Sequence, residues 1–208
     1  MSAVRESRPR LVLASGSPRR RQLLAELGLA FEVRPSDVDE SALPGETPEA
    51  MVERLAIAKA GARIAPGEVV LAADTIVVVD GRILGKPVDA SDAISMLAAI
   101  AGREHEVFTG VAVAIAALES PRRVAVRIAR TAVRMRALSV TEIADYVATG
   151  EPLDKAGAYA IQGLGSTLVA SISGNYTNVV GLPIPAVVDC LRDLGLDLAT
   201  FRPRQLSK

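Results

Sequence analysis

A short stretch near the N-terminus, LVLASGSPRRRQLL at residues 11–24, places a Gly/Ser turn and the three arginines Arg19–Arg21 directly after an apolar run. Ser17 and Pro18 predict a helix start, as N-cap and first-turn residues. The free N–H groups at a helix N-terminus bind anions, and guanidinium groups hold phosphate oxygens in pairs. The stretch therefore predicts a phosphate site, although an ordinary capped helix with solvated arginines shows the same pattern.

Acidic side chains follow in the next loop, at Asp37, Asp39 and Glu40. If this loop folds back toward the predicted helix start, its carboxylates would repel a phosphate unless a divalent cation lies between them. Magnesium and manganese prefer such hard oxygen ligands. The alternative is a solvated acidic loop without a ligand.

Asp74 interrupts the apolar run VVLAADTIVVVD. An ionised carboxylate in such a run is costly unless it is paired, hydrogen-bonded or bound to a metal. We expect Asp74 to end one strand segment and to open into a cleft at Thr75. There it would serve as a metal ligand or as the general base for a water molecule.

Three lysines and one glutamine extend this polar set. Lys86 in LGKPVD and Lys155 in DKAGAYAIQG have glycine or proline nearby, which fixes a loop, and Lys59 lies on an alanine-rich helix. Fixed lysines suit a polyphosphate, although any one of them taken alone fits a solvated surface charge. The amide of Gln162 has both a donor and an acceptor for a base edge.

The elements that must position these residues form a mixed α/β pattern rather than a strict alternation. Strands are expected at residues 10–14, 31–35, 68–74, 75–80, 82–84, 106–118, 122–138 and 166–173, the two long ones as an antiparallel pair about the turn at 119–121. Helices are expected at 18–27, from 48 with a face of Met51, Val52, Leu55 and Ala62, at 90–100, at 140–149 behind a Ser139–Glu142 capping box, and from about 185.

Composition narrows the class of protein. The 208 residues hold 24 basic and 24 acidic side chains, and a net charge of zero gives no general attraction to nucleic acid or to acidic membranes. A nucleic-acid interface remains an alternative because arginines recur at residues 122, 123, 127, 130, 134 and 136, but a charged, solvent-facing strand explains them more simply. The single cysteine, Cys190, cannot form an internal disulfide, and no signal peptide or membrane span is visible. We expect a cytoplasmic protein in which Cys190 and the single histidine, His105, are structural.

Several motifs together resemble one family. LASGSPRR, DVDES, LAIAKA, AADTIVVVDGRILGKP, HEVFTGVAV, YVATGEPLDKAGAYAIQG and NVVGLPI occur in the order found in the Maf family of nucleoside triphosphate pyrophosphatases. The resemblance covers about residues 10–195. It implies a single domain over residues 1–208 with a flexible tail at 1–9, and an elongated two-lobed α/β fold with a central cleft, like that of the inosine triphosphatase group. It also implies a homodimer and a divalent cation, Mg²⁺ or Mn²⁺.

The family's site residues can be placed on this sequence by the same motifs. Ser15, Arg19 and Arg20 resemble its phosphate-binding turn, and Glu40, Lys59 and Lys86 resemble its polar cleft residues. Asp74 matches the family's proton acceptor, and Arg19, Thr75 and Gln162 match the positions thought to set substrate choice. Asp74 would activate the water, while Glu40 completes the metal site or shares that role.

The stretch around Lys155 is similar to the branch of the family that acts on dTTP and UTP, and it differs from the branch that prefers 7-methyl-GTP. Ala160 stands where glycine is usual before IQG, and AIAG at residues 99–102 replaces the common LSG. The first departure is close enough to Gln162 to reshape a base pocket. A 7-methyl-GTP preference, or a regulator of septum formation that binds nucleotides without cleaving them, remain alternatives.

Overall fold

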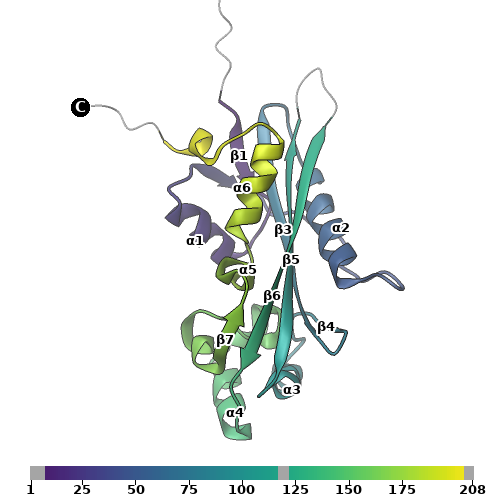
Figure 1. The fold of residues 1–208 in the computed structure, drawn as a ribbon, viewed down its shortest axis with the longest axis vertical. Coiled ribbons are helices and arrows are strands. Elements are labelled where there is room, and N and C mark those ends of the chain that lie inside the picture. The colour runs from purple at the N-terminus through teal and green to yellow at the C-terminus, as the bar shows by residue number, and fades with distance from the viewer. Residues whose placement is uncertain (1–7, 117–121, 204–208) are drawn as a thin grey trace, which may run out of the picture.

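The computed structural model describes residues 8–116 and 122–203, and its strands form one seven-stranded mixed sheet (Figure 1). The strands are β1 (Arg10–Leu13), β2 (Phe31–Val33), β3 (Glu68–Val79), β4 (Arg82–Leu84), β5 (Glu104–Ile115), β6 (Arg123–Met135) and β7 (Val169–Ser173). Their order is β2-β1-β3-β5-β6-β7, with β4 paired to β3. The β1 strand is parallel to β2 and β3, and the other pairings are antiparallel.

The helices gather around the two ends of the long strands, so the molecule is elongated and has two lobes (Figure 1). They are α1 (Pro18–Glu26), α2 (Pro48–Gly61), α3 (Ala90–Ile100), α4 (Val140–Ala148), α5 (Tyr176–Val180) and α6 (Ile184–Asp193), with the 3₁₀ turns η1 (Glu151–Asp154), η2 (Ala156–Ala158), η3 (Gly163–Leu168) and η4 (Leu198–Phe201). In the upper lobe α1 and α6 lie on one side of the strands and α2 on the other, while α3 and α4 lie in the lower lobe. The predicted mixed α/β class is confirmed.

Successive side chains of β3 point to opposite faces of the sheet, and they belong to different apolar clusters. Leu71 packs with residues of α1 and α6, and Val77 packs with residues of α3 and α4. Val70 and Ile76, on the opposite face, pack in clusters that contain residues of α2. Asp74 therefore belongs to the face that α2 covers, because side chains two residues apart share a face of a strand.

Three of the predicted helix starts are confirmed. The side chains of Ser17, Thr47 and Ser139 each accept a hydrogen bond from a backbone N–H of the following first turn. At α4 the reciprocal bond from the backbone of Ser139 to Glu142 completes the capping box. These starts are local in origin, which is why the sequence reveals them.

Other boundaries differ from the sequence prediction. The expected break after Asp74 is absent, since β3 runs without interruption from Glu68 to Val79 and Asp74 pairs with Gly110 of β5. The second strand ends at Val33, and the last begins only at Val169, because residues 163–168 form the turn η3. Ala62 follows the end of α2 and is exposed. Residues 1–7 of the tail expected at 1–9, and the whole turn expected at 119–121, lie outside the described residues.

One edge of β3 explains how a carboxylate in mid-strand can reach a cleft. On this edge β1 pairs with Glu68–Leu71 and β4 pairs with Val77–Val79, so residues 72–76 lie between two partner strands. The backbone carbonyl of Ala73 accepts a side-chain hydrogen bond from Arg20 there. Asp74 and Thr75 point to opposite faces of the sheet, and both flank this gap.

No helix in the described ranges is both long and apolar enough to cross a membrane.

Candidate active site

A cleft of about 560 Å³ opens at the gap in the edge of β3. This volume lies within the range of small-molecule sites. All ten predicted site residues line it: Ser15, Arg19, Arg20, Glu40, Lys59, Asp74, Thr75, Lys86, Lys155 and Gln162. They come from both lobes, and the cleft therefore unites motifs that are far apart in the sequence.

The buried carboxylate of Asp74 is held by the ammonium group of Lys59. Lys59 Nζ lies 2.6 Å from Oδ1 of Asp74 and 2.6 Å from Oε1 of Glu40. Burial disfavours the charged form of Glu40, but its contact with Lys59 and the charges of Lys86 and Arg20 hold the pKa of this carboxyl group below its usual value. One cation thus fixes two carboxylates that the sequence separates by 34 residues.

A close backbone approach sets the position of Lys59. A Cβ atom on Gly110 of β5 would lie 2.2 Å from the carbonyl oxygen of Val52, so α2 can pack here only against a glycine. Gly110 is the register partner of Asp74. Lys59 lies two helical turns after Val52 on the same buried side of α2, and it therefore reaches Asp74.

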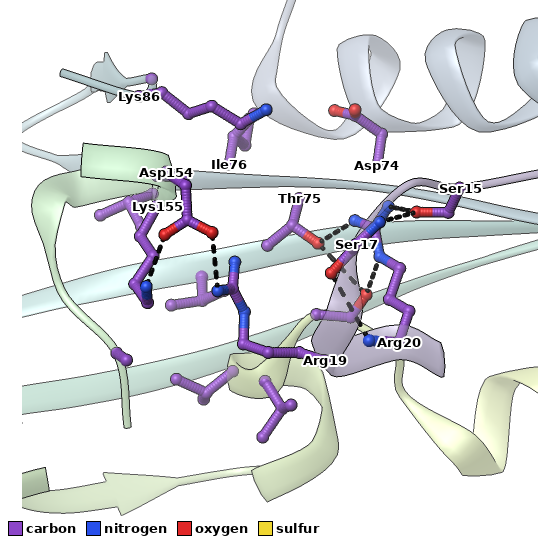
Figure 2. A pocket seen from close by; sticks show the side chains of 18 of the residues that line it. Ser15, Ser17, Arg19, Arg20, Asp74, Thr75, Ile76, Lys86, Asp154 and Lys155 are labelled. Carbon is purple, nitrogen blue, oxygen red and sulfur yellow. Dashed lines mark hydrogen bonds and ion pairs between the residues drawn. The ribbon is translucent and has the colours of Figure 1, made fainter. Parts of the chain in front are cut away.

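Arg20 ties three segments together at the turn after β1 (Figure 2). Its guanidinium group donates to Ser15 Oγ at 3.1 Å and to Thr75 Oγ1 at 3.0 Å, and to the backbone carbonyls of Ala73 and Gly181 at 2.8 and 2.7 Å. Four of its five N–H groups are thereby used within the protein. Arg20 can offer one N–H group to a phosphate, and its main contacts fix the phosphate turn to β3.

Arg19 and Lys155 meet across the cleft at the carboxylate of Asp154 (Figure 2). Arg19 Nη1 lies 3.3 Å from Oδ2 of Asp154, and Lys155 Nζ lies 2.5 Å from Oδ1. Lys155 also donates to the backbone carbonyl of Glu151. The loop that carries it is fixed at Gly157, whose N–H donates to the carbonyl of Gly85. Asp154 therefore forms ion pairs with two of the predicted phosphate ligands.

The remaining predicted polar residues differ in whether they line the cleft. Lys86 and Gln162 line the cleft, and Figure 2 shows Lys86 extending along its wall from the end of the β4 segment. Of the three acidic side chains in the loop only Glu40 lines the cleft, whereas Asp39 is exposed and accepts a hydrogen bond from the N–H of Ser41. Asp37 is also exposed and does not line the cleft.

His105, Cys190 and three of the arginines on and after β6 have their polar groups in contact with other residues of the protein. His105 is 2% exposed, with Nε2 2.7 Å from the hydroxyl of Tyr159, and burial lowers its pKa to about 4. Cys190 is a buried free thiol whose pKa burial raises to about 11. Three of the arginines on and after β6 form ion pairs: Arg127 with Asp193, Arg130 with Glu106 and Arg136 with Glu142.

Sequence reasoning missed three polar residues around the site. Asp154 joins Arg19 to Lys155, and its place beside Lys155 in the chain was the available signal. Glu151 and Tyr146 bind the backbone on both sides of Gln162. A carboxylate whose function is to accept main-chain N–H groups leaves no pattern in the sequence.

Asp74 and Glu40 are suited to a divalent cation whose remaining ligands come from a substrate and from water. Mg²⁺ is commonly held by one or two carboxylates together with substrate phosphates and water. In the described part of the chain no group of three or more His, Cys, Asp or Glu side chains is placed to hold a metal alone. The two carboxylates that share the ammonium group of Lys59 match in number and type the smaller protein ligand set of a cation that a substrate also holds.

Comparison with known proteins finds relatives that match nearly the whole chain. The protein named dTTP/UTP pyrophosphatase from Anaeromyxobacter dehalogenans strain 2CP-C is 54% identical over 195 residues, which are 94% of this chain and 99% of that protein. The protein of the same name from Moorella thermoacetica is 55% identical over 193 residues, which are 91% of this chain and 97% of that one. A solved dITP/XTP pyrophosphatase from Mycobacterium abscessus is 16% identical, with a TM-score of 0.34 over 60% of this chain and 74% of the other.

The family model described as Maf-like protein matches residues 10–194, which include every residue of the cleft named above. With this match and relatives above 50% identity over nearly the whole chain, the protein belongs to the Maf family.

Proposed function

We propose that this protein hydrolyses dTTP and UTP between the α- and β-phosphates and releases the nucleoside monophosphate and pyrophosphate. The names of its relatives support this substrate pair. The observation that carries the proposal is the buried carboxylate of Asp74, held by Lys59 within a cleft that is otherwise rich in cations.

The charge of the cleft suits a triphosphate. Five cationic side chains line it, against the carboxylates of Glu40, Asp74 and Asp154: Arg19, Arg20, Lys59, Lys86 and Lys155. Hydrolysis develops negative charge on the transferred group and on the leaving pyrophosphate, and fixed cations stabilise that charge. The arginines at the start of α1 would bind the triphosphate, whose negative charge is also favoured by the N-terminus of the helix.

Asp74 is the proposed general base. Its Oδ1 is bound by Lys59, which leaves Oδ2 to accept a proton from water. As the water oxygen bonds to phosphorus, the bond from that phosphorus to the bridging oxygen breaks and the water proton passes to Asp74. Lys59 fixes the direction of the carboxylate, because the ion pair joins two buried side chains.

A divalent cation would be held by Glu40 and Asp74. When bound, Mg²⁺ or Mn²⁺ would neutralise phosphate charge beside these carboxylates and act as a Lewis acid. Gln162 and Thr75 are proposed to read the base and to place the substrate. Uracil and thymine present an N–H donor beside carbonyl acceptors, and the amide of Gln162 can complement both.

The first test is pyrophosphate release by the purified protein with Mg²⁺ or Mn²⁺ and each of dTTP, UTP, CTP, GTP, ATP and 7-methyl-GTP. We expect release from dTTP and UTP, its loss after chelation of the metal, and a drop of at least about 100-fold in Asp74→Asn, since general bases contribute that much. Asp80→Asn is the matched control, because Asp80 forms an exposed ion pair with Arg103.

Each other result points elsewhere. Preferential release from 7-methyl-GTP would keep the reaction and replace the substrates. Full turnover by Asp74→Asn would refute the general base. Tight nucleotide binding without release from any nucleotide would favour a regulatory binding protein instead.

A cytoplasmic location and a homodimer are part of the proposal. The proposed substrates are cytoplasmic nucleotides, and the buried free thiol of Cys190 needs no oxidising compartment. Light scattering of the purified protein at twice the chain mass would support the dimer, and a value equal to the chain mass would refute it.

A further inference from the structure

The carboxylate of Glu151 binds the backbone just after Gln162. Its Oε2 accepts the N–H of Leu164 at 3.2 Å, and its Oε1 accepts the N–H of Gly165 at 2.9 Å. Hydrogen bonds to a charged acceptor are stronger than those between neutral groups. The carboxylate of Glu151 in η1 therefore anchors the first backbone N–H groups of η3.

The hydroxyl of Tyr146 binds the same segment on its other side. It donates to Oε1 of Glu151 at 2.9 Å and accepts the N–H of Ala160 at 3.2 Å. Tyr146 is only 5% exposed and packs in the apolar cluster of α3 and α4. One tyrosine and one glutamate thus bind the chain two residues before and two and three residues after Gln162.

Close packing leaves this segment little freedom. A Cβ atom on Gly165 would lie 2.4 Å from the carbonyl oxygen of Ala160 and 2.6 Å from the Tyr146 hydroxyl. A Cβ atom on Gly163, whose φ is +63°, would lie 2.9 Å from Oε2 of Glu151. The segment closes on itself with the Tyr146–Glu151 pair at its centre and with Gln162 on the cleft side.

We propose that Glu151 and Tyr146 are positioning residues that set base selectivity by fixing the amide of Gln162. This inference rests on the proposed pyrophosphatase function, since the selectivity is that of its substrates. Among the described residues neither side chain lines the cleft, so both act through the Gln162 segment. Lys155 donates to the backbone carbonyl of Glu151 rather than to its carboxylate. A substitution of the Glu151 side chain therefore keeps this hydrogen bond of Lys155.

The kinetic test compares UTP with CTP in Tyr146→Phe and in Glu151→Gln. The two bases are similar in size and differ in the donors and acceptors of one edge. We expect the ratio of kcat/KM for UTP over CTP to fall about tenfold in each variant, through KM for UTP, because backbone N–H groups beside Gln162 lose their acceptor and its amide loses its fixed place. Glu26→Gln, which removes a charge on the surface of α1, should leave the ratio unchanged.

Amide hydrogen exchange tests the same inference without turnover. We expect faster exchange at Leu164 and Gly165 in Glu151→Gln, and at Ala160 in Tyr146→Phe, with the amides of α4 unchanged. An unaltered UTP/CTP ratio in both folded variants would overturn the inference, and so would unaltered exchange. If the unmodified protein hydrolyses no nucleotide, the proposed function fails, while the exchange data still decide whether the pair fixes the segment.

Discussion

Lys59 Nζ lies 2.6 Å from Oδ1 of Asp74, and both residues are buried, with 7% and 6% of their surface exposed. A buried ion pair is costly to break, because the remaining charge stays in a poorly solvated place. Glu40 approaches the same ammonium group from the acidic loop. Lys59 therefore stabilises the two carboxylates that are proposed to hold the cation.

Replacing this lysine should weaken the fold and increase the affinity for metal. We expect Lys59→Met to lower the free energy of unfolding by about 3 kcal/mol, the cost of leaving a buried charge unpaired. Because a divalent cation can then neutralise Asp74 and Glu40, Mn²⁺ without nucleotide should raise the unfolding midpoint of the variant more than that of the unmodified protein. Lys86→Met, which removes a lysine from the same cleft, is the control. An equal response to Mn²⁺ in all three proteins would contradict the assigned carboxylates.

Asp154 forms ion pairs with Arg19 and Lys155, and it should therefore compete with the proposed triphosphate for these two cations. We expect Asp154→Asn to bind nucleoside triphosphates up to about fivefold more tightly, since partly exposed ion pairs are worth up to about 1 kcal/mol. Equilibrium binding of UTP in the absence of metal measures this effect. Asp145→Asn on the exposed side of α4 removes the same charge away from the cleft. Weaker binding in Asp154→Asn alone would show that this carboxylate orients the two cations for the phosphate instead.

The elements that local signals define were predictable from the sequence. Ser17 and Pro18 mark the start of α1, and Ser139 with Glu142 marks that of α4. The break expected after Asp74 was wrong, because the pairing of a strand is decided by distant segments. The gap on the edge of β3 exists only because β1 ends its pairing at Leu71 and β4 begins at Val77.

The same distinction applies to the site. The arginines, the lysines and the carboxylate within an apolar run could be recognised from the sequence as candidate site residues. The order of the motifs predicted that they belong to one site. The contacts made by Arg20 could not be predicted, since its partners at Ala73 and Gly181 are backbone carbonyls that any residue would offer. The anchoring role of Glu151 is invisible for the same reason, because it binds the N–H groups of Leu164 and Gly165.

Gly110 lies where the close packing of α2 leaves no room for a side chain. A Cβ atom there would lie 2.2 Å from the carbonyl oxygen of Val52, and backbone cannot move aside as a flexible side chain can. We expect Gly110→Ala to lower the free energy of unfolding by about 1–3 kcal/mol, as overpacked cores do. Gly85→Ala is the matched control, because no heavy atom lies within 4 Å of its added Cβ. Denaturant unfolding of both variants measures the difference, and equal losses would show that α2 adapts to the added methyl group.

His105 should make stability depend on pH between about 6.5 and 4. Burial lowers the pKa of this imidazole to about 4 from an ordinary value of 6.5, and its Nδ1 has no hydrogen-bond partner among the described residues. Between these values the unfolded chain binds a proton that the folded chain does not, so the free energy of unfolding falls as the pH falls through this window. The full loss is about 3 kcal/mol, since each pKa unit is worth about 1.4 kcal/mol. Urea unfolding at pH 6.5, 5.5 and 4.5 measures the slope, and His105→Gln should flatten it because the chain has no other histidine. An unchanged slope in the variant would assign the pH dependence to the carboxylates instead.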